Sequence, residues 1–218
     1  MSPRPRKVSD DEVFAAAHRA TNRLAPSELT LAEIAKEAGV TAGALAQRFG
    51  SKRLLLLALA RAAAESTGGF IAELKAAHKS PLTAVVAYAE CMAQLAQSPA
   101  ALARNLAYLQ IDLADPDFRE QLAVQARATR AGLEDLLASA VSAGELKRGT
   151  DVVTLARTVE AMVNGSMMTW GFYHDGPAEC WIRDDVNAVL APYRTSRPDA
   201  KRRSPLPPGS SVNGNGKT

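Results

Sequence analysis

The chain has 218 residues, 47% of them hydrophobic and only 5% aromatic, a mixture that can bury a core of alanine and leucine and favours an all-helical protein. Its net charge of +3 is uneven, because residues 1–53 carry nine Lys and Arg against six Asp and Glu, residues 54–193 carry eleven against sixteen, and residues 194–218 carry six against one. The basic N-terminal part fits a nucleic-acid partner, whereas two cysteines, Cys91 and Cys180, exclude a disulfide framework and indicate a reducing cytoplasm.

The first eight residues form a basic arm that contains Arg4, Arg6 and Lys7. We expect a flexible terminus whose cations contact the phosphates or the minor groove of DNA. No apolar segment follows these charges, which argues against a signal peptide.

The first predicted helix begins after Ser9. Ser9 and Glu12 have the spacing of a capping box, in which each side chain satisfies a backbone amide of the other residue. Apolar residues then recur at helical spacing, at Val13, Ala17, Ala20 and Leu24. The pattern predicts a helix of about four turns that ends near Pro26.

Residues 30–49, TLAEIAKEAGVTAGALAQRF, have the pattern of two short helices joined by a tight turn. Thr30 and Glu33 have the spacing of a second capping box, and Gly39 stands where a helix that ends in the left-handed conformation favours glycine. Thr41 can cap the second helix. The shared apolar stripe consists of Leu31, Ile34, Ala35, Ala38, Leu45 and Phe49. Helix, glycine turn and helix at this length form a helix-turn-helix unit, whose second helix enters the major groove of DNA.

Ser51 can cap a fourth helix, which starts with Lys52 and Arg53 beside the second helix of the unit. The leucines that follow lead toward the rest of the chain, so this segment is predicted to be a linking helix. The apolar run at residues 54–64 is interrupted by Arg61 and is too short to cross a bilayer. We therefore expect no membrane partner.

Proline marks three further helix starts, at residues 80–81, 98–99 and 115–116, where Ser or Asp is a good N-cap and proline takes the first helical position. The tail, residues 194–218, is rich in Arg, Pro, Ser and Gly, and we expect it to be disordered. The helices predicted between these marks span about 81–97, 99–110, 116–143, 151–174 and 178–190.

The N-terminal part closely resembles the DNA-binding domain of the TetR family of bacterial transcriptional regulators. The resemblance covers about residues 9–60, and the remaining residues match the family only in forming a helical body of suitable length. The residues that carry it are 31–35 (LAEIA), 38–41 (AGVT), Gly43, Leu45, Phe49, Ser51 and Lys52, followed by a run of leucines.

Membership implies an all-α fold of about nine to ten helices, in which a three-helix DNA-binding domain, residues 9–60, is joined by a linking helix to a larger helical bundle, residues 61–193. The bundle would form a homodimer and bind a small hydrophobic effector, and the protein would repress transcription from a palindromic operator. The two long helices, about 116–143 and 151–174, are the best candidates for the dimer interface, because two from each subunit can form a four-helix bundle.

One position departs from the family pattern, because Ala46 stands where family members usually carry a tyrosine that reaches a backbone phosphate. We predict that Gln47 is the main base-reading side chain, suited to adenine. For Arg48, guanine readout and a solvent-exposed or phosphate-facing charge stay open. Small residues that could contact a thymine methyl or let the backbone approach DNA are Ala42, Gly43 and Ala44. Predicted phosphate contacts come from Thr30, Thr41, Lys52 and the arm residues Arg4, Arg6 and Lys7.

A ligand pocket is predicted from methionine and aromatic residues with a few polar groups among them, which together describe an adaptable hydrophobic site. The same residues describe an ordinary core equally well, and both interpretations stay open. The predicted ligand-binding residues are Tyr88, Met92, Asn105, Tyr108, Met162, Asn164, Met167, Trp170 and Tyr173.

The sequence contains no glycine-rich phosphate loop, zinc-ligand spacing or nucleophile elbow. We therefore expect no enzymatic activity, no cofactor and no metal. The competing hypothesis is a helical interaction protein without effector control, whose DNA binding is degenerate or non-specific. The alanine-rich second helix of the helix-turn-helix unit and the missing tyrosine at Ala46 favour that alternative.

Overall fold

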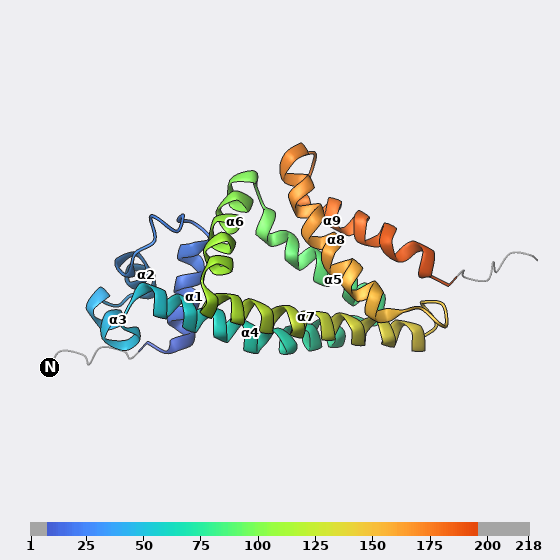
Figure 1. The fold of residues 1–218 in the computed structure, drawn as a ribbon, viewed down its shortest axis with the longest axis horizontal. Helices are drawn as coiled ribbons and strands as arrows, with labels where there is room; N and C mark the ends of the chain where they lie inside the picture. The colour runs from blue at the N-terminus through green and yellow to red at the C-terminus, as the bar shows by residue number, and fades with distance from the viewer. Residues whose placement is uncertain (1–7, 196–218) are drawn as a thin grey trace, which may run out of the picture.

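A computed structural model describes residues 8–195, so Arg4, Arg6, Lys7 and the tail from residue 196 lie outside the described part. The described residues form nine α-helices and two 3₁₀-helices and no strand beyond one isolated bridge, which confirms the predicted all-α fold (Figure 1). In chain order they are α1 (Asp10–Thr21), α2 (Leu31–Ala38), α3 (Ala42–Phe49), α4 (Lys52–Ala77), α5 (Pro81–Met92), η1 (Ala93–Ala96), α6 (Pro99–Ala114), α7 (Pro116–Ser142), α8 (Val152–Tyr173), α9 (Ala178–Leu190) and η2 (Ala191–Tyr193).

Three helix boundaries differ from the predicted ones. α1 ends at Thr21 and not near Pro26. The segment predicted as 81–97 divides into α5 and η1, and the segment predicted as 99–110 continues as α6 up to Asp115-Pro116. Helix α6 stops there because a residue before proline is driven out of the helical conformation.

The first three helices and the start of α4 enclose a small core of their own, and we call this part the head. The predicted apolar stripe faces that core, which confirms the helix-turn-helix arrangement. The buried side chains of the head core are Val13, Ala17, Ala20, Leu29, Ile34, Ala35, Leu45 and Leu55.

Local caps fix the orientation of the helix-turn-helix unit. Ser9 and Glu12 form the full capping box, with hydrogen bonds of 2.8 and 3.2 Å. At Thr30 the structure shows the hydroxyl half of the second box, because Thr30 Oγ1 accepts a hydrogen bond from the amide of Glu33 at 3.2 Å. Gly39 ends α2 with a φ of 69°, a left-handed conformation that costs glycine little.

Helix α4 joins the head to the body, by which we mean α5–α9 and the C-terminal half of α4. Leu55 of α4 belongs to the head core, whereas Ile71 of the same helix belongs to the body core. The predicted division between residues 60 and 61 therefore falls inside one continuous helix. Figure 1 shows α4 running beside α7, with the head at one end of the pair and α9 toward the other.

By length and composition alone, α4 could cross a membrane, because it has 26 residues and a mean hydropathy of 1.4 over its most apolar window. The sequence-based expectation of no membrane span considered only the apolar run at residues 54–64, and α4 extends well beyond that run. Core helices of soluble proteins pass the same test. In this fold α4 packs against α7 and α5.

The body core is built where the C-terminal half of α7 meets α4, α5, α8 and α9. Gly132 allows the close approach of α7 to α4, since a Cβ atom there would lie 2.6 Å from Cδ1 of Ile71. Helices α8 and α9 are joined by a hydrogen bond of 2.5 Å, which the Ser166 hydroxyl of α8 donates to Asp185 of α9. Four α7 side chains of this core are Leu133, Leu136, Leu137 and Ala140.

Candidate functional site

Helix α3 presents an exposed face of small side chains. Leu45 is buried against the head core, and Phe49 lies half-buried with its ring centroid 6.1 Å from that of Phe14. Because these two side chains pack on the head core, the opposite face of α3 points toward solvent, as predicted. The exposed residues on that side are Gly43, Ala44, Ala46, Gln47 and Arg48.

Ala42 differs from its neighbours in this face. Its side chain is half-buried and packs against the head core, so less of its methyl group is available to a base than that of Ala44. Gln47 is the exposed uncharged side chain of α3 with both a hydrogen-bond donor and an acceptor. Apart from Gln47 and Arg48, the exposed face thus carries only small side chains, which leave the backbone accessible.

Two threonine hydroxyls lie at the N-termini of α2 and α3, where the backbone dipoles favour an anion. Thr30 and Thr41 are both exposed, and each Oγ1 accepts a hydrogen bond from a backbone amide, of Glu33 at 3.2 Å and of Ala44 at 3.1 Å. A hydroxyl that accepts in this way keeps its own proton for donation. Both residues therefore suit the phosphate contacts predicted for them.

Arg48 makes intramolecular contacts that the sequence pattern did not indicate. Its Nη1 donates a hydrogen bond of 2.7 Å to the carbonyl oxygen of Val8, and its guanidinium forms an ion pair with Asp10. The guanidinium also lies 5.4 Å from the centroid of the Phe49 ring. Arg48 thereby holds the start of α1 against α3, and the basic arm joins the described chain at this point.

Lys52 is also engaged within the head. Its ammonium group donates hydrogen bonds to the carbonyl oxygens of Pro26 at 3.2 Å and of Leu29 at 2.7 Å. These two carbonyl groups belong to the loop between α1 and α2. Lys52 therefore stabilises the loop that leads into the helix-turn-helix unit, and its side chain is half-buried.

The head and the body are joined by polar contacts that the sequence did not single out. Arg53, at the start of α4, donates two hydrogen bonds of 2.8 Å to the carboxylate of Asp115 and one of 2.6 Å to Asp117. The hydrogen bonds from Arg53 hold the pKa of Asp115 below its usual value. From α6, the hydroxyl of Tyr108 donates a hydrogen bond of 2.9 Å to the carbonyl oxygen of Leu24.

A half-open cavity of about 490 Å³ lies between the head and the body, lined by α1, the loop after it, α4, η1, α6 and α7, and we call it the head–body cavity. Of the nine predicted ligand-binding residues, Asn105 and Tyr108 line it. Its walls are otherwise mainly apolar, and the apolar side chains are Leu56, Leu59, Leu95, Ile111, Phe118 and Leu122, with Pro26, Ala60 and Ala63.

The other predicted ligand-binding residues do not meet at one site. Tyr88, Met167 and Trp170 are buried in the body core, which Met92 also contacts, and Met162 is half-buried on α8. Asn164 is exposed and donates a hydrogen bond of 3.0 Å to the carbonyl oxygen of Glu160 in its own helix. Tyr173 is 65% exposed and stacks on Trp181.

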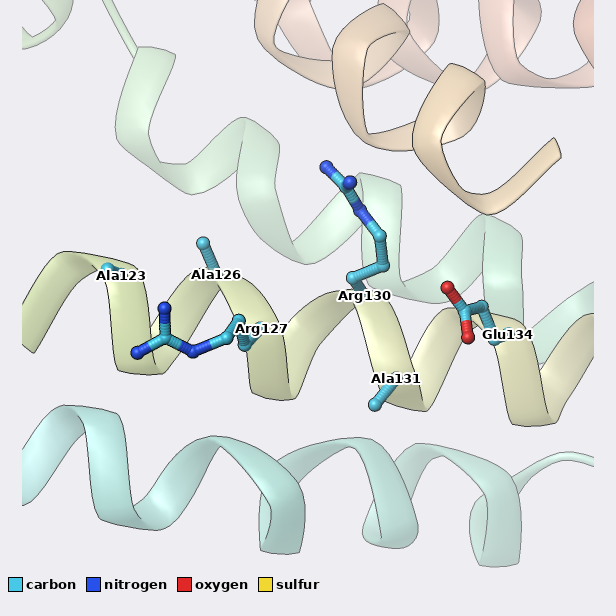
Figure 2. A pocket seen from close by; sticks show the side chains of 6 residues that line it. All are labelled: Ala123, Ala126, Arg127, Arg130, Ala131 and Glu134. Carbon is cyan, nitrogen blue, oxygen red and sulfur yellow. The ribbon is translucent and has the colours of Figure 1, made fainter. Parts of the chain in front are cut away.

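A second hollow lies along α7, and Figure 2 shows the six side chains that line it. All six come from this one helix and none is buried, so the hollow is an open groove. Arg130 reaches across to α8, where its Nε donates a hydrogen bond of 2.8 Å to Glu160. The lining residues are Ala123, Ala126, Arg127, Arg130, Ala131 and Glu134.

Two family models match the chain. The model described as bacterial regulatory proteins, tetR family, matches residues 13–59. The model described as tetracyclin repressor-like, C-terminal domain, matches residues 107–185. Together the two models span more than half of the chain, and no curated protein is significantly similar to it.

Three solved structures illustrate how widely this fold is shared. A TetR transcription regulator from Haloarcula marismortui is 17% identical, with a TM-score of 0.67 over 85% of this chain and 98% of that chain. SmeT, the repressor of the Stenotrophomonas maltophilia multidrug efflux pump SmeDEF, is 19% identical, with a TM-score of 0.62 over 92% and 98%. FadR from Bacillus subtilis, in complex with stearoyl-CoA, is 17% identical, with a TM-score of 0.62 over 84% and 98%.

Proposed function

Because this chain belongs to the TetR family of bacterial regulatory proteins, and is thus a DNA-binding transcription regulator, we propose that it is a homodimeric, cytoplasmic repressor. It binds a palindromic operator through α3 and is released from it by a small hydrophobic ligand. The observation that carries the proposal is the exposed face of α3, which is held on the head core by Leu45 and Phe49. Gln47 reads a base on this face, and Thr30 and Thr41 donate to phosphates.

The experiment that tests operator binding is a gel shift of the full chain on the promoter region of its own gene, with random DNA of equal length as the control. We expect a preference for the promoter region that persists as salt is raised, since phosphate contacts alone weaken steeply with salt. Equal affinity for both DNAs at every salt concentration would contradict specific repression.

The homodimer is supported by an apolar row that α8 leaves exposed. Ala161, Gly165, Met168 and Phe172 recur at helical spacing, and Phe172 is 77% exposed. Val153 lies on the same side of α8, beyond the exposed Arg157. The exposed middle of α7, with the alanines of Figure 2, lies beside α8 through the Arg130–Glu160 contact. Both predicted interface helices thus have exposed surface to offer a partner, whereas the buried leucines of α7 serve the subunit's own core.

A charge introduced into the α8 row tests the interface. Ala161→Glu is expected to shift the protein from dimer to monomer in size-exclusion chromatography with light scattering, because a buried unpaired carboxylate is costly. The matched control is Ala103→Glu on the exposed side of α6, which should stay dimeric. A dimeric Ala161→Glu protein would place the interface elsewhere.

Release by a ligand follows the logic of a population shift. A ligand that favours the body with its heads splayed moves α4, and the two α3 helices then fail to match successive major grooves. SmeT is the repressor of a multidrug efflux pump, and FadR was solved in complex with stearoyl-CoA. The FadR complex supports a hydrophobic effector for this fold, and the mainly apolar cavity beside α4 offers space for one.

The competing function is a helical interaction protein with degenerate or non-specific DNA binding and no effector control. Ala46 and the small side chains around it favour this alternative, because they offer no hydrogen-bonding groups to bases. The gel shift separates the two functions, since the alternative predicts equal binding to promoter and random DNA.

A further inference from the structure

We propose that the head–body cavity binds a hydrophobic ligand that carries a cationic amine, and that the carboxylate of Asp112 pairs with that amine. The inference rests on the proposed function, because it names the ligand class and the site of the effector. It differs from the sequence expectation, which placed most of the ligand contacts around the end of α8. The cavity volume of about 490 Å³ is within the range of small-molecule sites.

The walls of the cavity select for an apolar ligand body. Leu56 and Leu59 of α4, Ile111 of α6, and Phe118 and Leu122 of α7 line it from three directions. Aliphatic and aromatic walls favour a ligand of similar character, because apolar surface of both partners leaves water.

Asp112 is the carboxylate of the cavity that lacks a partner. It is half-buried on α6, and among residues 8–195 no hydrogen bond or ion pair reaches its carboxylate. Burial, with a smaller contribution from the nearby Asp115 carboxylate, raises the pKa of Asp112. An unpaired carboxylate in such surroundings loses hydration without compensation, and a cation supplies that compensation.

Two of the basic side chains that line the cavity, Lys52 and Arg53, are already engaged. Lys52 donates to the carbonyl oxygens of Pro26 and Leu29, and Arg53 donates to Asp115 and Asp117. The ring of His18 also lines the cavity, from α1. Of the two carboxylates in the lining, Asp115 is held by Arg53, so Asp112 is the one that a cationic ligand would meet unpaired.

A ligand in the head–body cavity would contact residues of the head directly. His18, Thr21 and Asn22 of the head form part of its lining, together with Tyr108 of the body. The hydroxyl of Tyr108 holds Leu24 in the loop after α1. A ligand in this cavity touches the head, the body and α4 between them, so its occupancy changes how the head sits on the body.

Three naphthalene probes of similar size test the proposal in the full-length protein without DNA. They are 1-naphthylmethylamine, which is cationic at neutral pH, 1-naphthalenemethanol, which is neutral, and 1-naphthoic acid, which is anionic. Binding is measured by fluorescence titration at pH 7. We expect the amine to bind tightest and the acid weakest.

Asp112→Asn keeps the shape of the side chain and removes its charge. It is expected to weaken binding of the amine about tenfold while leaving the alcohol unchanged, as for loss of a charged hydrogen-bonded pair. The matched control is Asp184→Asn, an exposed aspartate on α9, which should alter neither affinity. Equal affinity of the three probes for the wild-type protein, or amine binding that Asp112→Asn leaves unchanged, would overturn the proposal.

Ile111→Trp provides a second test that does not depend on Asp112. Ile111 is 48% exposed, so a larger side chain fits without disturbing a core, and it fills the cavity from α6. Binding of amine and alcohol should both fall, and unchanged binding would show that the probes bind elsewhere and overturn the site. The promoter gel shift is scored separately, so loss of operator preference and loss of amine binding are distinguishable outcomes.

Discussion

The hydroxyl of Tyr108 donates a hydrogen bond of 2.9 Å to the carbonyl oxygen of Leu24, a residue 84 positions earlier in the chain. The ring of Tyr108 also packs against the head core, although the residue belongs to α6 of the body. Partial burial raises its pKa to about 12, so the hydroxyl stays protonated and donates throughout the physiological range. One body residue therefore contacts the head through both its ring and its hydroxyl.

Tyr108→Phe is expected to lower the free energy of unfolding by about 1 kcal/mol, the usual net contribution of one hydrogen bond, because the ring stays while the carbonyl loses its donor. Urea denaturation measures the change. Tyr173→Phe is the control, because Tyr173 is mostly exposed and its hydroxyl bonds no described residue. Equal losses in the two variants would contradict a specific role for the Tyr108–Leu24 bond.

The contact of Arg53 with Asp115 predicts a dependence of stability on pH. The pKa of Asp115 is lower in the folded protein than its unfolded value of 3.8, chiefly through the Arg53 hydrogen bonds. The folded state then binds fewer protons, so the contribution of this contact is present above pH 3.8 and is lost as the pH falls through the folded pKa.

Arg53→Met should therefore lower the thermal unfolding midpoint at pH 7, and the difference from the wild type should shrink as the pH falls below 3.8. Circular dichroism measures both midpoints. Arg61→Met, an exposed position of the same helix, is the control and should have little effect at either pH. A difference for Arg53→Met that is the same at every pH would rule out the Asp115 carboxylate as its source.

Gly132→Ala should destabilise the protein by about 1–3 kcal/mol, since its Cβ would lie 2.6 and 2.8 Å from the side chain of Ile71. This clash outweighs the gain of about 1 kcal/mol that alanine brings to a helix. Gly68→Ala in α4 is the matched control, because no atom lies within 4 Å of its Cβ position. Denaturant unfolding should show opposite signs for the two variants, and stabilisation by both would contradict the close packing of α7 on α4.

Gln47→Ala should weaken binding to the specific operator by about 1–3 kcal/mol, which is at least about fivefold, while leaving non-specific DNA binding unchanged. Fluorescence anisotropy on operator and random duplexes measures both affinities. Gln110→Ala, an exposed position of α6, is the control. If operator and random DNA lose affinity equally, Gln47 is not the base-reading side chain.

Local signals predicted the helices well, because their chemistry is contained within a few neighbouring residues. Ser9 with Glu12, Thr41 before α3 and Gly39 after α2 each satisfy backbone groups one turn away. Such spacings are visible in the sequence itself. The same holds for Asp115-Pro116, whose proline fixes both the end of α6 and the start of α7.

Long-range partners were not predictable in this way. The sequence places Lys52 at the start of a helix near DNA, but its partners, Pro26 and Leu29, depend on where the preceding loop folds. Likewise, the spacing of Trp170 and Tyr173 on α8 does not reveal that the first side chain faces the core and the second faces solvent. Asp112 carried no pattern at all, because an unpaired carboxylate is defined by what surrounds it.

Because α4 contributes side chains to both the head core and the body core, its length determines how far the head moves when the helix tilts. With 26 residues, α4 is about 39 Å long, so a tilt of about 5° around its body end carries its head end through about 3 Å. A displacement of that size is comparable to the length of a hydrogen bond, on which base readout depends. A small change in the angle of α4 is thus large enough to move the exposed face of α3 out of contact with a base.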